Sequence, residues 1–150
     1  MNETTTSLTD LYRQTVLRHS RNPHNCRRPA TYDREAAGHN ALCGDKIHVY
    51  LRMGEDALED VAYEASGCAI SLASASMMSD AVTGKTVSET RRTIDDFMSG
   101  LSGLQAGTLE GELAALGGVR DYPSRIRCAT LPWQTLRAAL DAVSETVTTE

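Results

Sequence analysis

Three cysteines and one aspartate carry the residue types and spacing that a metal site requires. Cys43 and Asp45 flank a glycine in Leu42-Cys43-Gly44-Asp45, whereas Cys68 and Cys128 each precede a run of helix-forming residues. Three thiolates and one carboxylate complete the ligand set of a tetrahedral ion such as zinc, provided that the fold brings the segments together. We therefore expect the chain to be built around such a site.

The local sequence predicts different roles for these ligands. Cys68 and Cys128, placed at helix N-termini, would lie in a partial positive field that favours thiolate over thiol, and Arg125 adds positive charge beside Cys128. Gly44 permits a tight turn, so Cys43 and Asp45 can face one ion. A carboxylate suits zinc less well than a thiolate does, so Asp45 is the ligand expected to leave most easily.

Other interpretations of the same residue types stay open. The chain lacks the C-x-x-C pairs of a zinc finger, and free cysteines are common in protein cores. Cys26, which is followed by Arg27 and Arg28, is interpreted as an incidental loop cysteine. The four histidines show no paired spacing with another ligand, so none is assigned to a metal; they are His19, His24, His39 and His48.

Composition limits the classes of function. The 150 residues are expected to form one domain, 1–150, and the net charge of −5 argues against binding to nucleic acid. No apolar run of membrane-spanning length and no secretory signal pattern occurs, so we expect a cytoplasmic protein without membrane contact. Cysteines in that compartment stay reduced, which favours metal binding or thiol chemistry over disulfides.

Periodicity predicts an α+β fold, a small antiparallel sheet with helices packed on one face. Strands are expected at 46–53 and 58–65, joined as a hairpin. Residues 22–42 are expected to form an extended loop, since they are polar and rich in turn residues. Helices are expected at 8–19 and 69–82, and a third helix should begin at a capping box formed by residues 86–89. A short helix is expected at 109–116 within the Gly-rich segment 100–121. The last helix is expected at 129–147, with Pro132 in its first turn.

Several motifs, in order along most of the chain, resemble one known family. They are Asn22-Pro23, Gly38-x-Asn40-x-x-Cys43-Gly44-Asp45, Gly67-Cys68-Ala69-Ile70-Ser71, Gly84-Lys85, and Tyr122-Pro123-x-Arg125-Ile126-x-Cys128-Ala129-Thr130. Together they resemble the SufU branch of the IscU/NifU N-terminal family of iron-sulfur cluster assembly proteins. The Gly-rich segment 100–121 and Arg127, where IscU proteins typically have histidine, favour the SufU branch.

This resemblance implies a zinc protein that accepts persulfide sulfur from a SufS-type cysteine desulfurase and passes it to downstream iron-sulfur assembly proteins. It implies that Cys43, Asp45, Cys68 and Cys128 bind zinc and that Cys43 accepts the sulfur. Arg125 would help partner docking or hold Asp45 when it leaves the metal. Cys26 departs from the family pattern and leaves open a second sulfur-accepting thiol.

Two alternatives to this sulfurtransferase remain. The same four ligands suit a scaffold on which a [2Fe-2S] cluster is assembled, with iron in place of zinc. A non-catalytic adaptor, in which zinc only stabilises the fold, is the third candidate.

Overall fold

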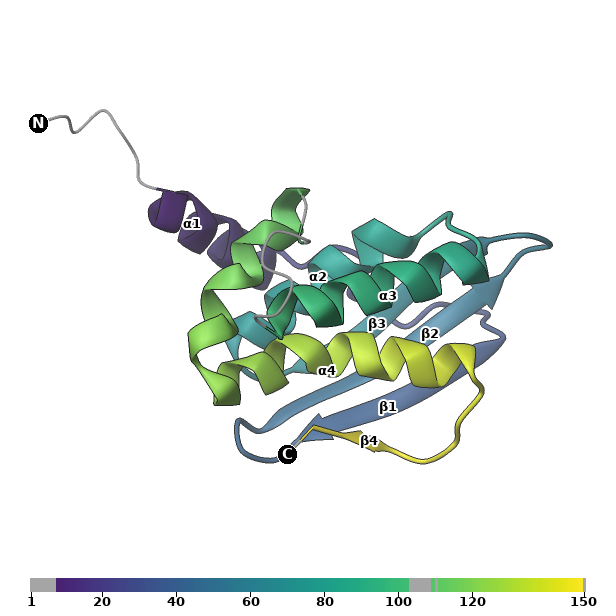
Figure 1. Ribbon diagram of the computed structural model, residues 1–150. Coiled ribbons are helices and arrows are strands. Elements are labelled where there is room, and N and C mark those ends of the chain that lie inside the picture. The colour runs from purple at the N-terminus through teal and green to yellow at the C-terminus, as the bar shows by residue number, and fades with distance from the viewer. Residues whose placement is uncertain (1–7, 103–108, 110, 150) are drawn as a thin grey trace, which may run out of the picture.

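The computed structural model describes residues 8–102, 109 and 111–149. Its elements, in chain order, are α1 (Leu8–Arg21), β1 (Arg34–Asn40), β2 (Asp45–Met53), β3 (Leu58–Ser66), α2 (Ala69–Val82), α3 (Val87–Leu101), the 3₁₀ helix η1 (Gly111–Asp121), α4 (Pro123–Leu140) and β4 (Val147–Thr148). The helices gather on one face of the sheet (Figure 1), which confirms the predicted α+β class. Over these described ranges, no helix has the length and apolar character needed to cross a membrane.

The sheet has the strand order β3-β2-β1-β4. The predicted hairpin is confirmed, since β2 and β3 pair antiparallel, and β1 pairs antiparallel with β2 on its other side. The sheet is nevertheless mixed, because the short β4 pairs in parallel with β1. The purely antiparallel sheet expected from the sequence is therefore wrong at this edge.

Strand β1 also corrects the prediction of a loop over 22–42. Its burial alternates, with Ala36, Gly38 and Asn40 on the helix-covered side. Gly38 is required there, because a Cβ on it would lie 2.1 Å from Thr135 Oγ1 of α4. The strand is thus defined by pairing with β2 and by close packing of α4.

Helices α2 and α4 form the buried layer over the sheet. Ser74 of α2 donates a hydrogen bond to the Ala129 carbonyl of α4 and accepts one from Trp133 Nε1 at 3.0 Å. The Trp133 ring stacks on Phe97 of α3 with centroids 4.3 Å apart. These contacts fix the position of α4 relative to the start of α2.

The ends of several helices follow the predicted signals. The helix expected at 69–82 is confirmed, and Thr86 and Glu89 form the expected capping box of α3. Helix α1 extends to Arg21, two residues beyond the prediction. The short helix expected at 109–116 is replaced by η1, and residues 103–108 and 110 of the Gly-rich segment lie outside the described residues.

Helix α4 begins six residues earlier than predicted. Pro123 occupies its first turn, whereas Pro132 lies inside the helix, buried in the core. A proline at the first helical position needs no hydrogen-bonded N–H, so Pro123 starts the helix. Cys128 is consequently not at a helix N-terminus, and that expectation is wrong.

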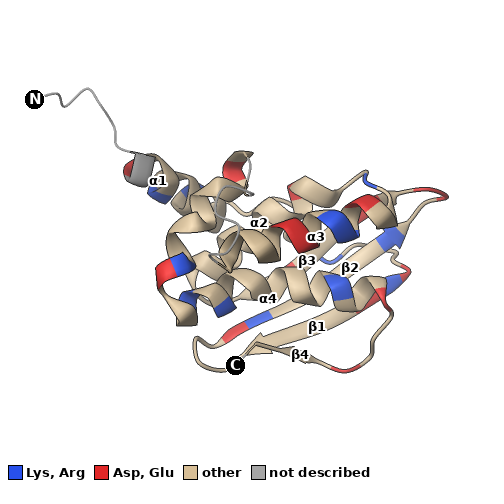
Figure 2. Cartoon of the chain, in the orientation of Figure 1, with Lys and Arg blue, Asp and Glu red and all other residues tan. Residues whose placement is uncertain are grey.

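Charged residues lie on the outer side of the helical layer. Figure 2 shows acidic and basic residues interspersed along α3. Two ion pairs join α3 to α4 and the residue that follows it, Arg137–Asp95 at 2.7 Å and Arg91–Asp141 at 2.6 Å. Both pairs are exposed, so they add little to stability.

Candidate metal centre

The residues predicted to bind metal converge at one end of the sheet. Cys43 lies in the turn between β1 and β2, and Asp45 is the first residue of β2. Cys68 is the N-cap of α2, as predicted, and Cys128 lies in the second turn of α4. Four separate parts of the chain therefore meet here.

The distances show a compact group of sulfur and oxygen atoms. The Sγ atoms of Cys43 and Cys128 are 3.0 Å apart, and Cys68 Sγ lies 3.8 Å from Asp45 Oδ2. One ligand atom each from Cys43, Asp45 and Cys128 lies within 4.8 Å of the other two. Cys68 joins this group through Asp45.

Two backbone features hold Asp45 in place. The N–H of Cys68 donates a hydrogen bond to Asp45 Oδ1 at 2.8 Å. Gly67, with φ of +138°, passes so close that a Cβ on it would lie 2.3 Å from the same oxygen. Glycine at this position is thus required by both conformation and space.

Asn40 is a site residue that the sequence analysis did not select. It is fully buried, and its Nδ2 donates to Asp45 Oδ2 at 3.4 Å and to Cys128 Sγ at 3.6 Å. Its Oδ1 accepts a hydrogen bond from the Leu42 N–H. The signal was present, since Asn40 belongs to the motif that carried the resemblance, but an amide suggests no ligand role on its own.

The three thiols differ in how far they are buried. Cys128 and Asp45 are fully buried, whereas Cys43 and Cys68 are partly exposed. Without an ion, burial raises the pKa of the Cys128 thiol above its ordinary value, and hydrogen bonds with Cys43 and Asp45 raise it further. The expectation that a helix N-terminus favours thiolate at Cys128 is therefore wrong; an ion is what would favour it.

Arg125 is exposed, one turn before Cys128 on α4, and faces the thiols. The pKa of Arg125 is raised by the nearby Cys68 and, to a smaller extent, by Cys128 and Cys43. Asp45, in contrast, forms no salt bridge with Arg125 in the described part of the chain. In this arrangement Arg125 faces sulfur rather than the carboxylate.

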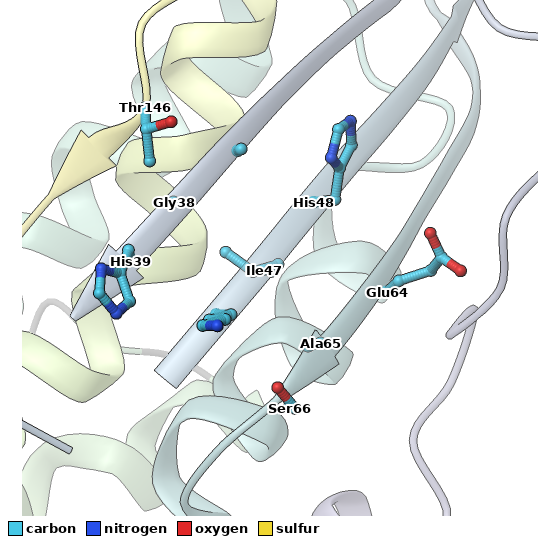
Figure 3. A pocket seen from close by; sticks show the side chains of 10 residues that line it. Gly38, His39, Ile47, His48, Glu64, Ala65, Ser66 and Thr146 are labelled. Carbon is cyan, nitrogen blue, oxygen red and sulfur yellow. The ribbon is translucent and has the colours of Figure 1, made fainter. Parts of the chain in front are cut away.

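Two hollows open near this end of the molecule. One, of about 570 Å³, is lined by apolar side chains of α1 and η1 and ends at Cys68 and Arg125. The other, of about 700 Å³, lies on the open face of the sheet, where His39, His48 and Glu64 project (Figure 3). No cysteine lines it, whereas Cys68 lines the first hollow.

The donor set fits a tetrahedral ion. Two sulfurs bound to zinc at 2.3 Å are about 3.8 Å apart in a tetrahedron. The 3.8 Å between Cys68 and Asp45 is close to this ligand spacing, and the shorter contact of Cys43 with Cys128 can open because Cys43 lies on a partly exposed turn. Cys26 lies outside this group, in the loop that bridges to Tyr63 of β3.

The fold and this cluster define a class of small α+β protein with a thiol and carboxylate centre at one end of its sheet. The chain belongs to the NifU-like N terminal domain family, whose sequence profile matches residues 11–143. The family resemblance inferred from the sequence is confirmed.

Individual relatives cover most of the chain. The zinc-dependent sulfurtransferase SufU of Bacillus subtilis (strain 168) is 38% identical over 134 residues, 87% of this chain and 89% of the relative. The iron-sulfur cluster assembly scaffold protein IscU of Streptococcus pyogenes serotype M1 is 37% identical over 135 residues, 89% of this chain and 84% of the relative. These relatives place the chain among iron-sulfur cluster assembly scaffolds or sulfur-transfer proteins.

Solved structures agree with this placement. The crystal structure of FiSufU from Fervidobacterium Islandicum AW-1 has a TM-score of 0.79 at 29% identity and covers 89% of this chain and 99% of its own. The N-terminal part of a NifU-like protein from Brucella abortus has a TM-score of 0.78 at 29% identity. The match covers 91% of this chain and 96% of that structure's chain.

Proposed function

We propose that this chain is a zinc-dependent sulfurtransferase, which accepts persulfide sulfur from a SufS-type cysteine desulfurase and delivers it to downstream iron-sulfur assembly proteins. The difference between two adjacent thiols supports this most strongly. Cys43 is partly exposed on a turn, whereas Cys128, 3.0 Å away, is fully buried. One thiol can therefore reach a partner while the other stays in place.

Cys43, Asp45, Cys68 and Cys128 would hold the zinc ion. The ion would keep their thiols deprotonated and restrain them as nucleophiles until a partner arrives. Cys68 and Cys128 come from two helices packed against each other, so they are the stable anchors. The name of the Bacillus subtilis relative supports zinc as the ion.

Cys43 would perform the transfer. Its thiolate attacks the outer sulfur of the partner's cysteine persulfide, a new S–S bond forms at Cys43, and the partner's cysteine leaves as a thiolate. Sulfur moves without net oxidation, and the proton on the outer sulfur travels with it. Gly44 has a positive φ (+70°), and nothing lies within 4 Å of where its Cβ would be, so nothing packs against this side of the turn that carries Cys43.

The apolar hollow that ends at Cys68 and Arg125 suits partner docking at the same place. Tyr122, which lines it, is 61% exposed, and Leu42, next to Cys43 in the chain, is 63% exposed. Large exposed apolar side chains beside a reactive centre favour a protein partner. Docking there would set the partner's persulfide against Cys43 and Arg125.

The test is transfer of radiolabelled sulfur from a SufS-type desulfurase to the zinc-loaded chain. Cys43→Ala is expected to abolish the persulfide on this chain, whereas the matched control Cys26→Ser accepts sulfur normally. A Cys43→Ala variant that still carries the persulfide would refute the assignment. If Cys26→Ser lost it instead, Cys26 would be the acceptor.

The scaffold function is supported by the Streptococcus pyogenes relative, which is named a scaffold. The same ligands could then hold iron in a [2Fe-2S] cluster. Chain isolated under anaerobic conditions separates the two functions. Colourless protein with tightly held zinc supports sulfur transfer or the non-catalytic adaptor, which the transfer assay then separates, and a brown protein with bound iron and sulfide supports the scaffold.

A further inference from the structure

A second cluster of potential metal ligands lies away from the cysteines. His19 comes from α1, His24 from the loop that follows it, and Asp80 from the last turn of α2. One ligand atom from each lies within 4.8 Å of the other two. Asp80 is twelve residues beyond Cys68, about 18 Å along the helix axis, so this cluster is separate from the thiols.

The individual contacts are close. His24 Nδ1 lies 2.5 Å from Asp80 Oδ2, and the two histidine rings have centroids 4.7 Å apart. Glu112 of η1 lies beside the cluster, with Oε1 at 2.8 Å from His19 Nε2. Two imidazoles and one carboxylate thus form the cluster, and Glu112 lies next to it through its contact with His19.

Neighbouring groups orient these side chains as outer-shell partners orient metal ligands. Ser76 Oγ lies 2.7 Å from His19 Nδ1, which leaves Nε2 directed at Glu112. Asn25 donates to Asp80 Oδ1 at 3.2 Å, which leaves Oδ2 directed at His24. The second nitrogen of His19 and the second oxygen of Asp80 are therefore already occupied.

Charge and access also suit a cation. Asp80 and Glu112 supply two negative charges, and α1 and α2 both end here, where their dipoles are negative. The ion pair of Arg18 with Glu112 offsets one of these charges, so one net negative charge remains for a cation. His19 is fully buried, but the side chains of His24 and Asp80 are 49% and 43% exposed, so an ion can enter from solvent.

We propose that His19, His24 and Asp80, with Glu112 beside them, form a second binding site for a divalent transition-metal ion. Imidazole and carboxylate ligands suit zinc, nickel, cobalt or copper. The short contact between His24 and Asp80 would lengthen as the ion enters, which these two exposed side chains allow. The bound ion would join α1, α2 and η1, independently of whether the cysteine centre transfers sulfur.

The test uses Ni²⁺ and Co²⁺ added to the full chain with zinc in its cysteine centre. Isothermal titration with Ni²⁺ should show one further equivalent bound to the wild-type chain. The added Co²⁺ should give only weak absorption bands, without the intense charge-transfer bands of thiolate ligation. Total zinc, measured in the same sample, shows that the first site has not exchanged.

Four variants show whether the further ion binds at this cluster or elsewhere on the chain. His24→Ala and Asp80→Asn change exposed side chains, so they should fold normally and lose the further equivalent. Asn25→Gly keeps the positive φ of 60° but removes the orienting amide, and should weaken binding about tenfold. The matched control His48→Ala removes a histidine that pairs with Glu35 on the open sheet face, and should bind as wild type does.

Either of two results overturns the proposal. One is a wild-type chain that takes up no further ion, which would mean that the cluster is only a hydrogen-bonded junction. The other is an unchanged affinity in both His24→Ala and Asp80→Asn. Neither result bears on the sulfur transfer at Cys43.

Discussion

The Cys68 N–H donates a hydrogen bond to Asp45 Oδ1 at 2.8 Å, which ties the N-cap of α2 to the first residue of β2. The bond makes a buried carboxylate part of the connection between sheet and helix. It also places Asp45 where its other oxygen faces Cys68 Sγ and the Asn40 amide. The same carboxylate thus has a structural oxygen and one directed into the cluster.

Replacing Gly67 should damage this connection. In Gly67→Ala the new Cβ would lie 2.3 Å from Asp45 Oδ1 and 2.8 Å from its Cα, on a backbone with φ of +138°. We expect a loss of about 3 kcal/mol in the free energy of unfolding, from strain and displaced packing together. Urea denaturation measures the loss in the free energy of unfolding. The zinc content of the folded variant shows whether the connection between Gly67 and Asp45 also affects the metal centre.

Gly44→Ala is the matched control for Gly67→Ala. Gly44 also has a positive φ, +70°, but a Cβ there would meet nothing within 4 Å. Its cost should be about 1 kcal/mol, the penalty of a left-handed conformation alone. Equal losses for the two variants would contradict the role given to the contact between Gly67 and Asp45.

Replacing Asp45 by asparagine should separate its two roles. Asn keeps an oxygen for the Cys68 N–H but removes the charge from a fully buried position. The variant should therefore fold, while its zinc affinity falls by more than the roughly 10- to 100-fold caused by loss of an outer-shell partner. Competition with a chromophoric chelator measures the affinity.

The control is Asp60→Asn, which removes a partly buried carboxylate of β3 that pairs with Arg27. It should bind zinc as wild type does. If Asp45→Asn binds zinc with wild-type affinity and accepts sulfur at the normal rate, Asp45 is not a ligand that exchanges.

How well the sequence predicted the site depended on local signals. Cys68 was correctly placed, because a glycine before the cysteine and a run of helix formers after it define a helix start within a few residues. Cys128 was misplaced because Pro132 was taken as the first turn, although Pro123 offered the same signal nine residues earlier. A second proline inside a buried helix is tolerated only through tertiary packing, which no local pattern reveals.

Strand β1 and the His19 cluster were missed for a related reason. Ala36, Ala37 and Gly38 have low strand propensity, and pairing with β2 and packing of α4 determine their conformation. His19 and Asp80 are far apart in sequence and meet only where two helices pack. Contacts of this kind depend on the assembled fold.

Tyr50 should make stability depend on pH at high pH. Burial, and then the hydrogen bond to Glu64 at 2.6 Å, raise the pKa of Tyr50 from 10.0 to about 12. The unfolded chain loses this proton first, so the contribution is complete below pH 10 and is lost as the pH rises towards 12. Tyr50→Phe should flatten this part of the stability curve, as measured by urea denaturation from pH 8 to about 12.

The control for Tyr50→Phe is Tyr32→Phe, which removes the hydroxyl group of a neighbouring ring that is tilted against Tyr50, with centroids 4.8 Å apart. Tyr32→Phe keeps the hydrogen bond between Tyr50 and Glu64, so the decline in stability above pH 10 should persist. A Tyr50→Phe variant with the wild-type decline would show that another group causes it.

Replacing Arg125 should slow the acceptance of sulfur without releasing the bound zinc. It is exposed, makes no ion pair with Asp45 in the described residues, and its pKa is raised first by Cys68 and then by Cys128 and Cys43. A guanidinium in that position stabilises thiolate charge as a persulfide approaches. Arg125→Ala should therefore lower the rate of persulfide transfer about tenfold or more, by analogy with the loss of one charged hydrogen bond.

Steady-state kinetics distinguish two ways in which Arg125 can act. If it helps the partner to dock, Arg125→Ala raises the half-saturating concentration of this chain in the desulfurase assay, and added salt reduces the difference from wild type. If it stabilises the thiolates, the maximal rate falls and Arg125→Lys restores part of it, because lysine keeps the charge. Arg127→Ala, the exposed control two residues away, should change neither parameter, and a loss of bound zinc in Arg125→Ala would contradict both roles.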